Sequence, residues 1–258
     1  MKKSVAVVVV VALLVAKDAE AQRVRRRFEP TDLRLTPTGV AEIDLQAGYL
    51  RSDQGHSRVF APDVEASIGV SERVELEVDT TYGFHDGEAD FLDDTWASLR
   101  LGIVDDRREG ESQADAAWAA GAQAGPRIPT TSLSKSIGFE GIFIAGRNVG
   151  PAHVFGQIGG LVDPFDLAFA PRRVRPVAIE GGLDLDLDLD QVDAWSLHAE
   201  LGGARYFSPH PDQIHASAGP SYRVVPWLEV SVVGVAGLLP GADRWGVLFG
   251  MAPRFRAF

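Results

Sequence analysis

Apolar and polar residues alternate along most of this chain, and the clearest run is residues 183–190, which read Leu-Asp four times. Successive side chains of a strand point to opposite faces, so this run would place its leucines on one face and its aspartates on the other. A helix would spread both residue types around its axis. Residues 40–49, 63–70 and 74–84 alternate in the same way. The pattern predicts β-strands with one apolar and one polar face.

About twelve such segments follow one another along the chain. Each has about 10–15 residues, whereas strands of globular proteins most often have about 5–6 and strands that cross a membrane need about 9–11. The excess length favours strands that span a bilayer. The segments are 39–51, 58–69, 73–84, 94–104, 113–127, 136–147, 152–163, 174–189, 193–207, 213–223, 228–239 and 244–258.

Short and long connections alternate between these segments. The short ones are 70–73, 148–151, 190–192 and 224–226, with a longer but highly charged link at 105–112. The longer ones are 85–93, 128–135, 164–173 and 208–212. Short periplasmic turns and longer external loops are typical of outer-membrane barrels. We therefore predict an all-β fold, a transmembrane antiparallel up-and-down β-barrel of about 12 strands with both termini in the periplasm.

Aromatic residues gather near the predicted strand ends, as expected for belts at the two lipid–water interfaces. An ordinary β-sandwich with aromatic caps on its core is the alternative. The loop-side set is Tyr49, Phe60, Tyr82, Phe84, Phe165, Phe169, Tyr206, Phe207 and Trp245, and the turn-side set is Trp118, Trp195 and Trp227.

The last segment departs from the simplest barrel pattern. Phe258 lies one residue out of phase with the apolar positions that run from Trp245 to Phe255. A β-bulge near Pro253 would restore the phase. Pro220 and Pro253 are themselves unexpected, since a closed barrel has no free edge where a strand proline is tolerated.

The N-terminal residues predict export. Lys2 and Lys3 precede an apolar run over 4–16, and Ala19-Glu20-Ala21 supplies small residues before a cleavage site. We interpret residues 1–21 as a signal peptide, 22–38 as a periplasmic N-terminal segment and 39–258 as the barrel domain. The chain has no cysteine, which excludes disulfides and a lipoprotein anchor.

The net charge of the chain limits the kinds of molecule that it is expected to bind. Removing residues 1–21 takes three of the 25 basic and two of the 36 acidic residues, which leaves 22 and 34 and a net charge of −12. An acidic protein repels nucleic acid, so DNA or RNA binding is not expected. The expected location is the cell outer membrane. The expected partners are outer-membrane lipid and lipopolysaccharide, the outer-membrane assembly machinery and small-molecule solutes.

A resemblance is carried by three stretches: residues 27–33 (Arg-Phe-Glu-Pro-Thr-Asp-Leu), Gly39 to Tyr49, and Val59 to Val70 with its continuation through Val74–Tyr82. They make up about a quarter of the chain. Here the sequence resembles the family of outer-membrane proteins of the phenol-degradation meta-pathway. That resemblance implies a barrel fold and uptake of small, often apolar solutes.

The polar strand faces supply the candidate site. If they point into the lumen, the turn-side half of the barrel carries a negative field that favours cations. Alternatively, these side chains only solvate a water-filled interior. Some of the carboxylates are expected to pair with Arg100, Arg127, Arg205 and Arg223. The predicted lumen-lining residues are Glu42, Asp44, Glu65, Glu75, Glu77, Asp79, Asp184, Asp186, Asp188 and Glu229. No metal site and no cofactor are predicted.

Two basic runs stand apart from this pattern. Arg172, Arg173 and Arg175 fall in a predicted external loop, where guanidinium groups would pair with lipid-A phosphates or simply face water. Arg23 and Arg25–Arg27 follow the predicted cleavage site. They would either plug the acidic lumen or stay disordered in the periplasm, and we expect disorder.

An enzyme would need a nucleophile, a base and an orienting group within hydrogen-bond reach. Ser196, His198 and Glu200 alternate on one strand face, where neighbours lie about 7 Å apart. The other candidates are His153, His215 and Ser217. No catalytic residues are predicted.

The strand number sets the expected function. Eight strands leave a filled interior and sixteen an open channel, so twelve predict a narrow passive pore for small solutes. The alternatives are a blocked structural or adhesive barrel, a lipid-modifying barrel enzyme and a soluble periplasmic sandwich.

Overall fold

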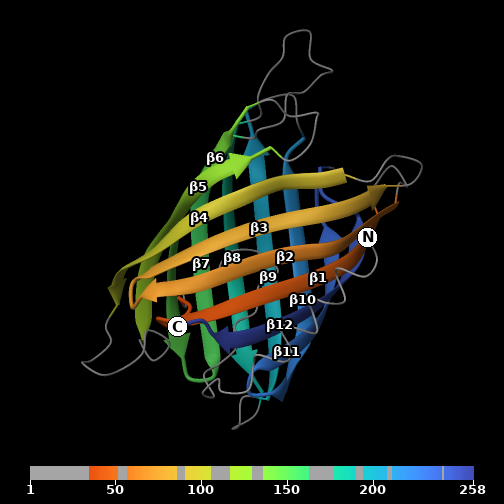
Figure 1. Ribbon diagram of the computed structural model, residues 1–258. Helices are drawn as coiled ribbons and strands as arrows, with labels where there is room; N and C mark the ends of the chain where they lie inside the picture. Colours follow the sequence, from red (N-terminus) through yellow and green to blue (C-terminus); the bar gives the residue numbers. More distant parts are fainter. Residues whose placement is uncertain are drawn as a thin grey trace, which may run out of the picture.

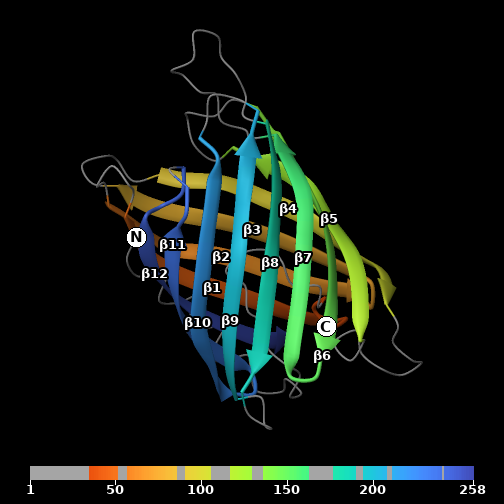
Figure 2. The ribbon, with the colours of Figure 1, turned by 180° about the vertical axis from the view of Figure 1, so that it is seen from behind.

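The protein folds as a closed barrel of twelve antiparallel strands (Figures 1 and 2). The computed structural model describes residues 35–51, 57–85, 91–105, 117–129, 136–162, 177–189, 194–207, 211–239 and 241–258. Each strand pairs with the next along the chain, and the last pairs with the first. The predicted up-and-down topology and strand number are confirmed. The strands are β1 (Val40–Arg51), β2 (Ser57–Ser71), β3 (Val74–His85), β4 (Phe91–Asp105), β5 (Trp118–Ile128), β6 (Gly138–Val149), β7 (Ala152–Val162), β8 (Val177–Asp188), β9 (Trp195–Tyr206), β10 (Gln213–Val225), β11 (Leu228–Gly237) and β12 (Trp245–Arg256).

The period-two alternation assigns the two faces of the wall. In β8, Leu183 and Leu185 are 61 % and 40 % exposed, whereas Asp184 between them is only 6 % exposed. Because the sheet is closed, buried alternate positions face the interior and exposed ones face outward. The outer face is therefore an apolar band of leucine, valine, isoleucine and phenylalanine, as a surface in contact with lipid requires. Within the described ranges, no helix is long and apolar enough to cross a membrane.

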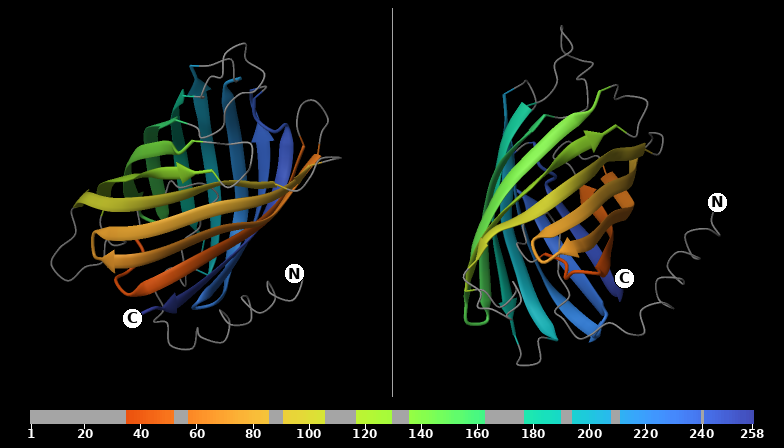
Figure 3. Two further views of the ribbon diagram at one scale, coloured as in Figure 1. Left: turned by 45° about the horizontal axis from the view of Figure 1, so that its top comes forward. Right: turned by 60° about the vertical axis from the view of Figure 1, so that its left-hand side comes forward.

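The barrel is strongly twisted. Strands β1–β4 run steeply across strands β7–β10 of the opposite wall, and the tilted views of Figure 3 show the same crossing. This arrangement follows from the tilt and right-handed twist that closing a small barrel demands. It brings the inner faces of opposite walls toward each other across the lumen.

Four prolines lie inside strands. Pro62 of β2 lies where the ladders to β1 and β3 both shift register, and the barrel accommodates the other three in one common way. Pro126, Pro220 and Pro253 keep an unbroken ladder with one neighbouring strand, where they face Phe139, Leu197 and Leu228. The ladder with the other neighbour has a gap of two residue pairs at the proline. A proline has no N–H to donate, so a local gap on one side is sufficient. The expectation that a closed barrel does not tolerate such prolines is wrong.

The expected bulge near Pro253 is also wrong. The β1–β12 register is the same on both sides of this residue, with Glu42 facing Arg254 and Leu45 facing Met251. Phe258 instead lies beyond the end of β12 and is 67 % exposed. Its backbone N–H donates to the carbonyl oxygen of Gly39, 3.2 Å away, which ties the chain end to the start of β1.

Short turns connect three of the hairpins at one end of the barrel. They lie at 72–73, 150–151 and 226–227, and Gly150 adopts the positive φ of +59° that favours glycine in a tight turn.

Exposed tryptophans mark both ends of the wall. Trp245 packs against Tyr49 near the loop end, and Trp195 packs against Tyr222 near the turn end, with ring centroids 5.5 and 4.6 Å apart. Phe165 and Phe169 lie outside the described residues.

Candidate functional site: the inner wall of the barrel

The ten predicted lumen-lining carboxylates all lie on the inner face of the wall. Six are buried and the other four are half-buried. The buried set is Glu42, Asp44, Glu75, Glu77, Asp184 and Glu229, and the half-buried set is Glu65, Asp79, Asp186 and Asp188. We call the polar layer formed by these ten carboxylates the inner acidic wall. The basic loop Arg172, Arg173 and Arg175 lies outside the described residues.

One arginine organises the carboxylates of β3. Arg100 of β4 is 1 % exposed and lies 3.4 Å from Glu75 and 3.1 Å from Glu77, measured from guanidinium nitrogen to carboxylate oxygen. It also donates two hydrogen bonds, of 2.9 and 2.6 Å, to Oε1 of Gln123 in β5. The Gln123 amide in turn donates to Glu77 at 2.7 Å and to Ser98 at 2.8 Å. This network links β3, β4 and β5, and the pairing predicted for Arg100 is confirmed.

The residues just before β1 join this layer. Thr36 is 1 % exposed, its backbone N–H donates to Glu75, and its hydroxyl lies 2.9 Å from that of Ser67. Gly69 makes room for this contact, since a Cβ there would lie 2.1 and 2.2 Å from the carbonyl oxygens of Thr36 and Pro37. Sequence reasoning placed Thr36 in the periplasmic segment. The glycine within an otherwise regular strand was the available signal for the close approach.

Other arginines occupy varied positions. Arg127 pairs with Glu140, a carboxylate outside the predicted set, and its guanidinium lies 5.8 Å from the ring centroid of Trp96. Arg205 is exposed on the outer face, so the expectation that it pairs with lumen carboxylates is wrong. Arg223 lies across the ladder from Glu229. Arg254, which sequence reasoning missed, lies 2.6 Å from Glu42.

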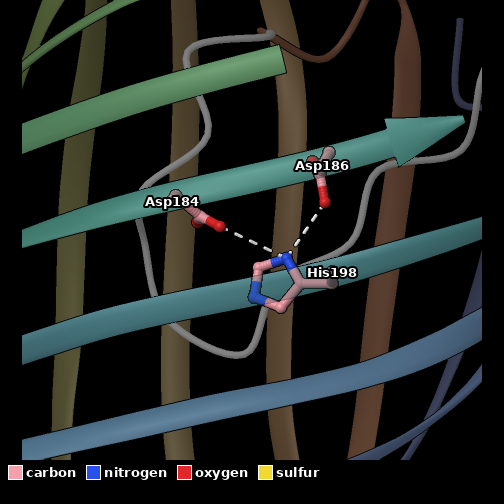
Figure 4. A group of neighbouring side chains, drawn as sticks. All are labelled: Asp184, Asp186 and His198. Atoms are coloured by element: carbon pink, nitrogen blue, oxygen red, sulfur yellow. Dashed lines mark hydrogen bonds and ion pairs between the residues drawn. The ribbon is translucent and has the colours of Figure 1, made fainter. Parts of the chain in front are cut away.

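Three histidines of the inner wall contact carboxylates. His198 of β9 lies between two aspartates of β8, with Nδ1 3.0 Å from Asp186 and 3.3 Å from Asp184 (Figure 4). His153 of β7 lies 3.1 Å from Asp188, and His215 of β10 lies 3.6 Å from Glu200.

The serines proposed for an enzyme have other neighbours. The Ser217 hydroxyl donates to Glu200 over 3.4 Å. Ser196 lies across the β9–β10 ladder from Ser221, whose own hydroxyl donates to Glu229 over 2.6 Å. His198 directs its Nδ1 to Asp186 instead of a serine. The structure therefore brings the histidines together with acids.

The inner face is not polar throughout. Trp96, Ile142, Ile144 and Phe155 form an apolar cluster with Ala119 on the inner side of β4–β7. A second cluster, Leu50, Val233 and Leu248, lies where β1, β11 and β12 meet. Sequence reasoning assumed a uniformly polar lumen. The run Ile142-Phe143-Ile144, apolar on both faces, was the signal that the lumen is partly apolar.

Comparison with solved structures agrees with this architecture. A NanC porin superposes with a TM-score of 0.60 over 82 % of this chain and 98 % of its own, at 8 % sequence identity. The monoaromatic hydrocarbon channel CymD superposes with a TM-score of 0.49 over 86 % of this chain and 89 % of its own, also at 8 % identity. At such identity the likeness to the NanC porin shows the fold alone. No family model and no curated protein matches the sequence.

Fold and surface together define the class. A closed twelve-stranded antiparallel barrel with an apolar outer band and a polar, partly apolar interior is a membrane-spanning barrel. In its fold the chain is a membrane-spanning antiparallel β-barrel like the NanC porin.

Proposed function

We propose that the protein is a narrow passive pore for small solutes, with an acidic lumen on the side of the short turns. The observation that carries this proposal is the inner acidic wall, in which carboxylates outnumber the arginines that face them. Enclosed charges of one sign raise the local concentration of the opposite ion and reject ions of like sign. The pore would therefore prefer cations.

Packing of the inner face supports a narrow passage. Glu75, Arg100, Gln123, Ile144 and Val233 are each at most 1 % exposed although they point inward. Side chains so completely covered fill the space next to the wall and leave only the centre for a solute. Twelve strands lie between the filled eight-stranded barrel and the open sixteen-stranded porin, which agrees with this reading.

The acidic wall and the apolar clusters of the inner face together indicate the class of solute. Apolar clusters beside an acidic wall suit small amphipathic or cationic molecules better than sugars or anions. The resemblance of residues 27–33, 39–49, 59–70 and 74–82 to the phenol-degradation family points to small apolar solutes as well.

Planar-bilayer recording of the refolded protein tests the proposal. We expect stepwise currents and, under a salt gradient, a reversal potential that reports cation preference. Asp44→Asn with Glu65→Gln removes two carboxylates that face each other across β1 and β2, and it should shift the reversal potential toward zero. Glu72→Gln, in the exposed 72–73 turn, is the matched control. Silent membranes would favour the blocked barrel, and currents without ion preference would refute the acidic-lumen part.

The enzyme alternative has its own measurement. Turnover of phospholipid or lipid A by the refolded protein, abolished in His198→Ala, would replace the pore proposal. We expect no turnover above that of empty detergent micelles.

A further inference from the structure

We propose that Asp184, Asp186 and His198 form a binding site for a divalent transition-metal ion, of which Zn²⁺ is the best fit, on the inner wall between β8 and β9. The proposal goes beyond the pore and does not depend on conduction. Figure 4 shows the two carboxylates of β8 directed at the imidazole of β9.

The three side chains converge because of strand geometry. Asp184 and Asp186 are two positions apart and so share the inner face of β8. His198 faces Asp186 directly across the β8–β9 ladder. One ligand atom from each residue lies within 4.8 Å of the others. The register of two neighbouring strands thus assembles a mixed nitrogen and oxygen donor set.

The separations suit a small tetrahedral ion. Ligand atoms about 2.0–2.1 Å from zinc lie about 3.3 Å from one another at a tetrahedral angle. Nδ1 of His198 lies 3.0 Å from Asp186 and 3.3 Å from Asp184, close to that separation. A site with one imidazole and two carboxylates suits Zn²⁺ and its transition-metal neighbours, whereas Ca²⁺ requires six to eight oxygen ligands.

A second observation comes from the residues that flank His198 on the same face of β9. Ser196 is 1 % exposed and Glu200 is 5 % exposed. Within the described part of the chain, the Ser196 hydroxyl is buried and makes no hydrogen bond, and the Oε1 atom of Glu200 lies 3.6 Å from Nε2 of His215, beyond hydrogen-bond distance. A buried polar atom without a hydrogen bond indicates a missing water or ion. Glu200 also faces Asp184 across the ladder, where it can supply a further oxygen.

The charges of this sector differ from those near Arg100 and Arg254. Glu75 and Glu77 share the permanent charge of Arg100, and Glu42 pairs with that of Arg254. At the β8–β9 site the facing group is His198, which is charged only when protonated. A bound divalent ion would balance the negative charge of the buried carboxylates.

Access to the site is available from the lumen. The side chains of Asp184 and His198 are 6 % and 3 % exposed, but that of Asp186 is 14 % exposed. An ion in the lumen would therefore meet Asp186 first. His198, which lies beside Asp186, then supplies a nitrogen ligand. A nitrogen ligand favours Zn²⁺ over Ca²⁺.

The test uses the tag-free, refolded protein in detergent, with Zn²⁺ and Co²⁺ as probes. We expect calorimetry to show one Zn²⁺ site per chain, and bound Co²⁺ to show visible absorption. His198→Ala and the pair Asp184→Asn with Asp186→Asn should each weaken Zn²⁺ binding by at least about tenfold. Ca²⁺ should not compete at equal concentration.

Asp79→Asn is the matched control, because Asp79 is an inward carboxylate, half-buried like Asp186, on β3, which pairs with neither β8 nor β9. It should leave Zn²⁺ affinity and the Co²⁺ spectrum unchanged. The proposal is overturned if wild-type protein binds no Zn²⁺, or if Asp79→Asn and His198→Ala weaken binding equally. Heat-modifiable gel migration of every variant checks that the barrel has folded. If the barrel binds zinc but does not conduct, the metal site stands while the proposed pore fails.

Discussion

Arg254 of β12 donates two hydrogen bonds to one carboxylate oxygen of Glu42 in β1, at 3.0 and 2.6 Å. The two residues are 212 positions apart in the sequence and face each other directly where the last strand meets the first. Both side chains are less than 8 % exposed. A buried, charge-assisted pair therefore lies at the seam that closes the barrel.

Breaking this pair should weaken closure. Arg254→Met removes the cation beside the buried carboxylate, and loss of one partner of a buried pair costs about 3–5 kcal/mol. The double variant Glu42→Met with Arg254→Met should recover most of the loss, since an apolar pair leaves no buried charge. Urea unfolding in detergent, followed by tryptophan fluorescence, measures both. A double variant as unstable as the single one would contradict this account.

Gln123 should contribute as much to the stability of the barrel as a charged residue of the inner wall does. It accepts two hydrogen bonds from Arg100 and donates to Glu77 and Ser98 while only 1 % exposed. Gln123→Leu leaves those partners buried without their bonds, for which we expect a loss of about 2 kcal/mol or more. Gln213→Leu, at the start of β10, is the control and should change the unfolding free energy by less than about 0.5 kcal/mol. Equal effects would show that the network adds no stability.

The glycine before Pro220 should not accept a side chain. A Cβ at Gly219 would lie 1.9 Å from the carbonyl oxygen of Val232 in β11, within the gap beside the proline. Gly219→Ala must therefore separate β10 and β11 locally, and we expect a loss of about 1–3 kcal/mol. In Gly234→Ala, on the facing strand, the nearest atom is 3.8 Å away. Unfolding on heating changes the migration of a barrel on a gel. Gly234→Ala should show this change at the same temperature as the wild type, whereas Gly219→Ala should show it at a lower temperature.

The two faces of β8 should be distinguishable by spin labels. The chain contains no cysteine, so Leu185→Cys and Asp186→Cys each create a unique attachment site. A label at 185, whose leucine is 40 % exposed on the outer face, should be relaxed by oxygen dissolved in lipid. A label at 186 should respond to a water-soluble nickel reagent instead. The opposite result would place the apolar row inside and remove the basis of the pore proposal.

Local patterns were sufficient for the strands and their faces. The period-two runs around residues 74–84 and 183–190 predict strands that begin and end within a few residues of β3 and β8. The same alternation predicts that Leu185 faces outward and Asp186 inward. These features depend only on near neighbours in the sequence, because side-chain direction in a strand changes at every residue.

The contacts across strands could not be read from the sequence. The pairing of Arg254 with Glu42, the position of Thr36 against Glu75 and the inner cluster around Ile144 all depend on register and on barrel closure. A register shift of one residue would reverse every side chain of a strand, so a contact between distant residues exists only once all twelve strands are aligned.

The sequence by itself therefore determined a chain of alternating strands with an acidic inner face and an apolar outer one. Only the tertiary structure decided which carboxylates face an arginine and which, like Asp184 and Asp186, face a histidine. The physical reason is that alternation is a local property of the backbone, whereas the neighbour across a ladder is set by hydrogen bonding between strands over the whole closed sheet.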